Sequence, residues 1–411
     1  MAFSLDEFFR DSGTRFLLHP QAPMLEDFRE PEPVWVSSPR GSLAPGPADD
    51  RMYAIDPIDK KPYDETSLPP YRGPVHPPAR PGPDGHFDHI TPGRPGFRAA
   101  HMFGAIRRVL DIWEVYAGGP LPWHFDYAFD RLELVTKVSF RNAHFGTGFC
   151  ECGDEVDDQG NVHPFALNFD VLAHETGHGL VFSMVGMPGE DTLSTDFLGF
   201  HESASDLVAL LSALHFESFI RHVLRRTGGD LYVANEMNRI GELSGTKQIR
   251  IASNPRRLSD LAYRAKAPMD LTGKEVHTLG QPMTGAIFDI IVVLFLRRLV
   301  ETGAVPAHLA EAARRSVDGT LPTEAERGAT RGLYESNPGP FHDALRDARD
   351  MVGLRLAATW HRLRPHHLRF ETVAASFMAV DRSLTGARYQ DAIRACFAWR
   401  GIDPSENPAQ G

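Results

Sequence analysis

The sequence has few cysteines, no excess of basic residues and no long apolar run. Its three cysteines, Cys150, Cys152 and Cys396, are too few for a disulfide framework and favour a reducing setting. The formal net charge of −11 argues against nucleic acid or an anionic membrane as the main partner. The longest apolar stretch, residues 287–296, is interrupted by Asp289 and is too short to span a bilayer.

The first residues, MAFSLDEFFRDSG, lack the basic region and the long apolar segment of a secretory signal. We therefore expect a cytoplasmic protein, and export by a dedicated secretion system stays open. The sequence contains no internal repeat and carries no indication of an oligomeric state.

More than half of the 32 prolines lie in residues 1–95. This composition predicts an extended, largely irregular N-terminal segment that wraps on the surface or is partly disordered, rather than an independent domain. His86 and His89 in DGHFDH are interpreted as solvated loop histidines rather than metal ligands.

The remaining chain predicts an α+β fold in two lobes. Residues 96–185 combine a helix that ends before Gly118, a strand over residues 131–140, a glycine-containing edge strand and a helix over residues 171–184. Residues 186–411 are predicted to be mainly helical. An active site is expected in the cleft between the lobes.

The segment VLAHETGHGL carries the pattern His174-Glu175-Thr176-Gly177-His178. On a helix, positions i and i+4 share one face, so both imidazoles can reach one metal ion while Glu175 serves as a general base. The alternative is a surface helix with two solvated histidines. The apolar residues on both sides favour a buried helix, in which the histidines need partners.

A second amphipathic pattern, GFHESASDLVALLSALHF, places Glu202 and Asp206 on one helix face. A catalytic zinc site uses three protein ligands and leaves the fourth position to water. Glu202 is the candidate third ligand beside His174 and His178. Asp206 is the candidate carboxylate that accepts the second N–H of a ligating imidazole.

The motifs HETGH and HESASD resemble those of the thermolysin-like gluzincin metallopeptidases, and the resemblance covers about residues 97–295. It implies a zinc-dependent endopeptidase with Glu175 as general base. EVHTLGQPMTG is similar to the fungalysin form of the segment with the catalytic histidine, which implies that His277 stabilises the oxyanion. RYQDAIRACFAWRGI is similar to the family's closing helix.

Further matches to the family imply a site for a peptide or protein substrate. RNAHFG is similar to the edge strand that pairs with substrate backbone, which assigns this role to Asn142 and Ala143. NPRRLSD implies that Arg256, with Arg257 as the alternative, grips the substrate carbonyl. By family position, Val171 and Ile240 line a pocket for an apolar residue after the cut.

Two departures separate the sequence from this family. The segment HGLVFSMVGMPGED has no tyrosine after the zinc helix. The family's paired calcium site is also incomplete in this sequence. Asp170 and Glu242 match two of its carboxylate ligands, whereas Met237, Arg239 and Ala213 occupy other ligand positions. We therefore expect one zinc ion and no calcium, with Arg239 as counter-charge to the two carboxylates.

Three other functions stay open. Many gluzincins are aminopeptidases, but the sequence has no GxMEN-like motif for binding an amine. A non-catalytic zinc-binding protein is favoured by the missing tyrosine and opposed by Glu175, because a structural site needs no general base. An exported, toxin-like effector would carry the same sequence features.

Overall fold

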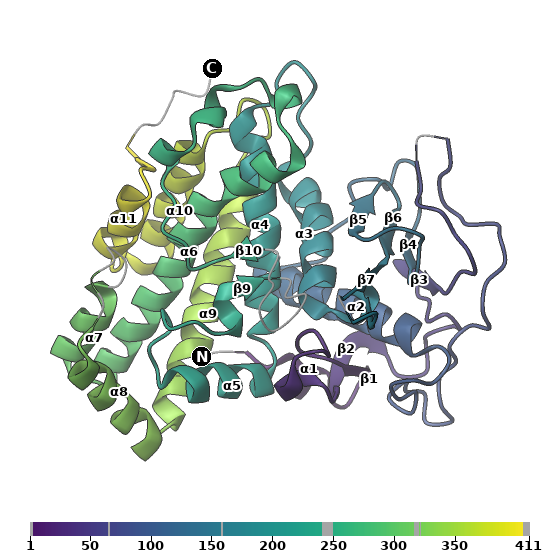
Figure 1. The fold of residues 1–411 in the computed structure, drawn as a ribbon, viewed down its shortest axis with the longest axis horizontal. Coiled ribbons are helices and arrows are strands. Elements are labelled where there is room, and N and C mark those ends of the chain that lie inside the picture. The colour runs from purple at the N-terminus through teal and green to yellow at the C-terminus, as the bar shows by residue number, and fades with distance from the viewer. Residues whose placement is uncertain are drawn as a thin grey trace. The chain divides into compact units, whose positions relative to one another are not determined.

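The computed structural model describes residues 3–64, 66–157, 159–240, 250–315, 320 and 322–405. The chain forms two compact units (Figure 1). We call them the sheet unit, Ser4–Ser183, and the helical unit, which comprises Phe3, Met184–Ile240 and Arg250–Gly411. The predicted α+β class is confirmed, because small sheets precede a mostly helical part. The domain boundaries after residues 95 and 185 stay a prediction.

The sheet unit is built around a mixed four-stranded sheet with the order β3-β4-β6-β5. Strands β3, β4 and β6 are parallel, and β5 runs antiparallel to β6 at the edge. The elements of this unit are α1 (Leu5–Phe9), β1 (Gly13–Leu18), β2 (Glu32–Pro39), β3 (Met52–Ile55), α2 (Phe97–Ala117), β4 (Leu132–Val135), β5 (Ala143–Gly146), β6 (Phe149–Cys152), β7 (Asp154–Val156), β8 (Val162–Pro164) and α3 (Phe169–Val185).

Helix α2 connects the parallel strands β3 and β4 and packs against both. It ends as predicted, because Gly118 adopts a φ of 80° and its N–H bonds to the carbonyls of Glu114 and Val115. Strand β4 is shorter than the predicted strand over residues 131–140. The chain leaves the sheet at Thr136, whose hydroxyl donates to the Asp56 carboxylate at 2.6 Å.

Parts of the proline-rich segment are buried against the rest of the sheet unit. Lys60 and Tyr63 are buried against the sheet. The Lys60 ammonium donates to buried Glu151 at 2.8 Å, and the Tyr63 hydroxyl donates to buried Glu133. Buried carboxylates need such partners, so the two strand acids hold this segment in place. Its strands β1 to β3 were not predicted from its composition.

The helical unit has the long helix α6 at its centre, packed against α4, α9 and α11 (Figure 1). The apolar run at residues 287–296 lies within α6 and is buried there. The elements are α4 (Thr195–Ala213), β9 (Arg239–Ile240), β10 (Arg250–Ile251), α5 (Glu217–Thr227), α6 (Gly273–Glu301), α7 (Ala307–Arg314), α8 (Glu324–Ser336), α9 (Gly339–Trp360), α10 (Phe370–Thr385) and α11 (Gln390–Trp399).

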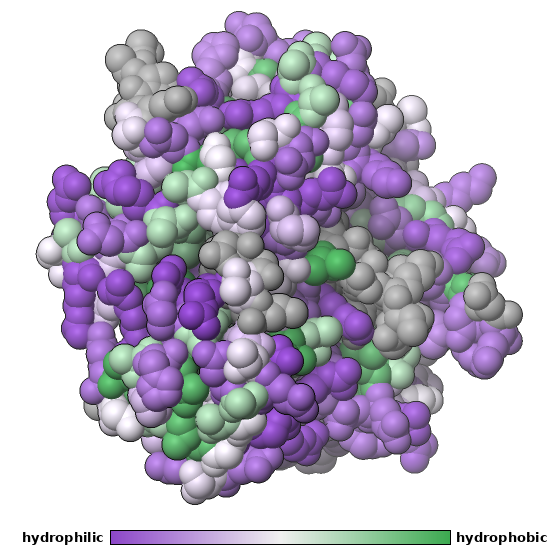
Figure 2. Space-filling model, turned by 60° about the vertical axis from the view of Figure 1, so that its left-hand side comes forward, coloured by the Kyte–Doolittle hydropathy of each residue, from purple (hydrophilic) through white to green (hydrophobic). Residues whose placement is uncertain are grey.

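Hydrophilic residues predominate on the face drawn in Figure 2, and its hydrophobic residues form small, separate groups. Large exposed apolar side chains such as Phe8, Tyr127 and Met269 come from different segments of the chain. Within the described residues, no single helix is long and apolar enough to cross a membrane. The pair α4 and α5, bent by 94°, meets the length and composition criteria only when the two helices are taken together.

Candidate metal centre

Helix α3 carries the predicted metal motif, and its start is defined by Asn168. The Asn168 side chain accepts the N–H of Val171 at 3.3 Å. Asp170 in the first turn adds a negative charge where the helix dipole favours one. The helix therefore begins two residues before the predicted limit and contains the whole motif.

The side chains of His174, Glu175 and His178 come together on α3. One ligand atom from each lies within 4.8 Å of the others, and the two imidazole centroids are 4.7 Å apart at 85°. His174 and Glu175 are buried, and His178 is half-buried. Two imidazole nitrogens next to a carboxylate are a donor set that fits zinc. Among the histidine, cysteine and carboxylate side chains of the described residues, these three form the group that is compact enough to hold one ion.

The β5–β6 end of the sheet packs against the motif. A side-chain carbon on Gly179 would lie 2.5 Å from Cζ of Phe145 in β5, so glycine permits this contact directly after His178. On β6, a hydrogen bond with Cys152 and burial raise the pKa of the Cys150 thiol, and the charge of Glu175 adds to the rise. The edge strand thus lies beside the motif within one unit.

The cysteines behave as buried strand and helix residues. Cys150, Cys152 and Cys396 are buried and free of disulfides. Burial also raises the pKa of the Cys396 thiol, so this thiol is held in its unreactive, protonated form. None of the three belongs to the compact metal-ligating group of the described residues.

Glu202 and His277 meet in the helical unit. Helix α4 begins at Thr195, seven residues before Glu202, because the Ser194 hydroxyl accepts the N–H of Phe197. Helix α6 begins at Gly273 with a capping box between Thr272 and Glu275, so His277 already lies in the helix. Its Nδ1 lies 2.6 Å from Oε2 of Glu202.

Close packing of α4 on α6 brings Glu202 and His277 together. A side-chain carbon on Gly280 would lie 2.7 Å from the carbonyl oxygen of Gly199, so the helices can approach this closely only with glycine at this position. One turn later, the Thr284 hydroxyl donates to the Ser203 hydroxyl at 2.9 Å. Asp206 is buried one turn after Glu202 on α4. The role of Glu202 as third ligand and of Asp206 as its support stays a prediction.

The predicted substrate-binding residues lie in several places. Asn142 is exposed and directly precedes Ala143, the first residue of edge strand β5. Val171 is buried in the first turn of α3. Ile240 pairs through its backbone with Arg250. Their roles in binding substrate stay predictions.

The Arg256 side chain is exposed, and hydrogen bonds hold its backbone in place. Its N–H donates to the Asn254 side chain at 3.0 Å, and its carbonyl accepts from Arg400 at 3.2 Å. Arg400 follows the predicted closing helix, α11, and forms a buried ion pair with Asp289 at 2.7 Å. Arg257 stacks instead on Trp399, with 3.3 Å from its Cζ to the ring centroid. Of the two arginines, Arg256 therefore suits the predicted role better.

The predicted calcium positions provide few carboxylates. Asp170 is buried and accepts from the Gln21 amide at 2.7 Å. Met237 and Ala213 are buried and offer no side-chain oxygen. Glu242 lies outside the described residues, and its pairing with Arg239 stays a prediction.

Sequence reasoning missed two contacts of the site. The hydrogen bond between His277 and Glu202 has no sequence signal, because the two residues lie 75 positions apart. The close approach of Phe145 to Gly179 could have been inferred from the glycine that follows HETGH.

Comparison with known proteins leaves the family unassigned. No family model matches the chain, and no curated protein matches it. Among solved structures, the chain is similar to a precursor of protealysin, a metalloproteinase from Serratia proteamaculans, at 13% sequence identity. That match covers 85% of this chain and 87% of the other, with a TM-score of 0.46.

Proposed function

We propose that the protein is a zinc-dependent endopeptidase that hydrolyses internal peptide bonds. The observation that carries this proposal is the compact group of His174, Glu175 and His178 on a mostly buried helix. A carboxylate placed beside two imidazoles suits a general base next to a metal better than it suits a structural site, which would close all four positions.

The proposed ligands are His174, His178 and Glu202, with Asp206 orienting an imidazole. Bound there, zinc would act as a Lewis acid and lower the pKa of a coordinated water. Glu175 accepts a proton from the attacking water as the oxygen bonds to the carbonyl carbon. When the C–N bond breaks, Glu175 passes this proton to the leaving amine.

The remaining residues bind the substrate and stabilise its developing charge. His277 is proposed to donate to the oxyanion. Asn142 and Ala143, at the start of the edge strand β5, are proposed to pair with an extended peptide, because β5 closes one side of the sheet in the described residues. Arg256 is proposed to bind a substrate carbonyl, and Val171 and Ile240 to favour an apolar residue after the cut. A peptide-library profile that favours acidic residues there would contradict this pocket.

The direct test compares N-blocked and unblocked peptides, with and without a chelator. An endopeptidase cleaves both, and the chelator abolishes cleavage. Cleavage of unblocked peptides alone would identify an aminopeptidase, and cleavage of neither would identify a zinc-binding protein without activity. Zinc analysis of the same samples establishes the metal.

The variant Glu175→Gln tests the mechanism. It should bind zinc as the wild type does and lose hydrolysis, because the amide cannot accept the proton. Glu190→Gln, at an exposed acid outside the site, is the matched control and should keep activity. Hydrolysis that survives in Glu175→Gln would exclude the mechanism.

We also propose a cytoplasmic location, because three buried free thiols suit a reducing compartment. Fractionation of the producing cells, with the culture medium assayed in parallel, tests this location. Recovery of the protein mainly from the medium would favour the exported effector.

A further inference from the structure

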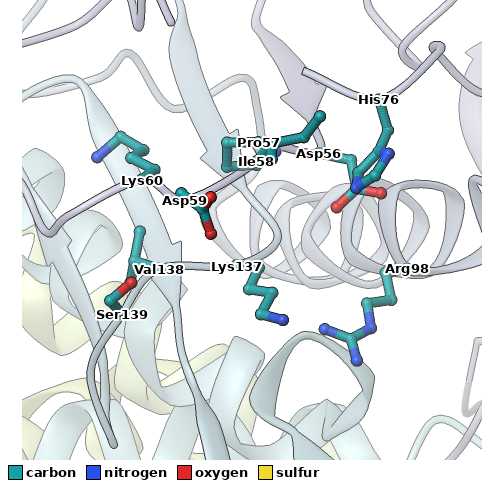
Figure 3. A pocket seen from close by; sticks show the side chains of 10 residues that line it. All are labelled: Asp56, Pro57, Ile58, Asp59, Lys60, His76, Arg98, Lys137, Val138 and Ser139. Carbon is teal, nitrogen blue, oxygen red and sulfur yellow. The ribbon is translucent and has the colours of Figure 1, made fainter. Parts of the chain in front are cut away.

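The sheet unit contains a cavity of about 320 Å³ that lies apart from the metal motif. It opens where β3 and β4 end, and the residues after these two parallel strands form most of its wall. Arg98, in the first turn of α2, and His76 complete it (Figure 3). Ligand sites are common at the carboxyl ends of parallel strands, because several chain segments converge there. We call it the strand-end cavity.

One wall of the strand-end cavity carries two cations that share a single carboxylate. The Arg98 guanidinium lies 3.2 Å from Asp154, and the Lys137 ammonium lies 3.8 Å from the other oxygen of the same carboxylate. Both cationic side chains remain partly exposed, at 31% and 57%. Figure 3 shows their charged ends close to each other. This wall therefore has an uncompensated positive charge.

The opposite wall carries Asp56 and Asp59. The Asp56 carboxylate accepts the Thr136 hydroxyl at 2.6 Å, a neutral partner that leaves its charge in place. Asp59 is exposed, and its φ of 53° is unusual for a residue with a side chain. Figure 3 shows its carboxylate turned towards the middle of the ring of labelled residues.

Lys60, next in the chain, does not neutralise Asp59. Its ammonium is buried and bonds to Glu151 at 2.8 Å and to the Lys61 carbonyl at 3.0 Å. In Figure 3 its side chain extends away from Asp59. In the described part of the chain, the acidic wall therefore keeps a negative charge that no cation neutralises.

These two walls select the class of ligand. A simple anion would meet the two acids, and a simple cation would meet Arg98 and Lys137. A single metal ion is also disfavoured. A protein site for one metal ion typically uses at least three ligating side chains close together, and among the described residues Asp56 and Asp59 belong to no group of three within 4.8 Å. A ligand with separated charges of both signs satisfies both walls.

We propose that the strand-end cavity binds a short zwitterionic peptide. Its carboxylate is held by Arg98 and Lys137, which suits the planar, two-pronged guanidinium. Its ammonium is held by Asp59, and Asp56 adds negative charge to the same wall. The volume is at the lower limit for small-molecule sites and matches a ligand of two or three residues. This binding site shares no residue with the metal motif and does not depend on the proposed peptidase activity.

The test is calorimetric titration of the full-length, chelator-treated protein with L-alanyl-L-alanine at low ionic strength. Removing metal prevents hydrolysis and prevents binding of the carboxylate to zinc, so the outcome is independent of the peptidase proposal. N-acetylated and C-amidated forms of the dipeptide each lack one charge and should each bind about tenfold more weakly. Equal binding of all three forms, or no binding at about 10 mM dipeptide, would overturn the proposal.

Two variants assign each charge to a wall. Asp59→Asn should weaken binding of the free dipeptide and should abolish the further loss caused by N-acetylation. Lys137→Met should likewise reduce the loss caused by C-amidation, because among the described residues Arg98 is then the only partner of the carboxylate in this wall. Lys61→Met is the matched control, since Lys61 is exposed in the same segment and does not line the cavity. Unchanged thermal unfolding midpoints confirm that the variants are folded, and additive losses in both variants would contradict the assignment.

Discussion

Nδ1 of His277 lies 2.6 Å from Oε2 of Glu202. An ionised carboxylate only accepts hydrogen bonds, so Nδ1 is the donor and the orientation of the ring is fixed. The second imidazole nitrogen is then directed away from Glu202, and it can donate to a substrate oxygen only when the ring is protonated on both nitrogens. The carboxylate retains further lone pairs and a second oxygen, so binding His277 and binding a metal are compatible. One histidine can therefore position Glu202, the proposed third ligand, and also serve the role proposed for it at the substrate.

These two roles of His277 can be separated by zinc titration. We expect His277→Ala to lower zinc affinity about 10- to 100-fold through Glu202. We also expect kcat to fall about 10²- to 10³-fold at saturating zinc, because a donor to the oxyanion is lost. His361→Ala, at an exposed histidine, is the control. Full recovery of kcat with excess zinc would leave His277 with a positioning role only.

Gly280 sets the distance between α4 and α6. In Gly280→Ala the new carbon would lie 2.7 Å from the Gly199 carbonyl oxygen, so the helices must separate. We expect a loss of about 1–3 kcal/mol in the free energy of unfolding, together with lower activity. Gly328→Ala in α8 meets no atom within 4 Å and should instead stabilise the protein by up to about 1 kcal/mol. Urea unfolding measures both, and effects of the same sign would contradict this account.

Local patterns predicted those parts of the site that lie within one helix. The i, i+4 spacing places His174 and His178 on one face, and the glycine at 118 ends α2 where expected. Contacts between distant segments could not be predicted in this way. Lys60 reaches Glu151 across 91 positions, and a proline-rich composition carries no signal for a buried lysine. The composition of a segment indicates only how buried its residues are on average. Each buried acid of the sheet, in contrast, needs one particular partner.

The edge strand is predicted to contribute through Asn142. We expect Asn142→Ala to lower kcat/KM about threefold to tenfold, which corresponds to the loss of one hydrogen bond to substrate. Gln159→Ala, at an exposed turn between β7 and β8, should leave kcat/KM unchanged. Steady-state assays with one N-blocked peptide compare the two variants. Equal kcat/KM values for both would remove Asn142 from the substrate site.

The folded sheet unit holds His101 in its neutral form. Its Nε2 accepts the His19 N–H at 3.1 Å, so its Nδ1 carries the proton and donates to the Ala166 carbonyl at 2.9 Å. Burial, with a smaller contribution from His19, lowers the pKa of His101 from 6.5 to about 3. Between these two pH values the unfolded chain binds a proton that the folded chain does not. The free energy of unfolding should therefore fall as the pH falls from 6.5 towards 3, and this contribution is absent above pH 6.5.

The variant His101→Gln isolates this contribution. Glutamine can accept from the His19 N–H and donate to the Ala166 carbonyl but does not titrate, so its stability should depend less on pH by up to about 1.4 kcal/mol per pH unit. His308→Gln removes an exposed histidine and is the control. Urea unfolding at steps from pH 7.5 to pH 4 gives the slope for each protein. The other titrating groups are the same in the wild type and in both variants. If the unfolding free energy of His101→Gln depended on pH as steeply as that of the wild type, His101 would be protonated in the folded protein.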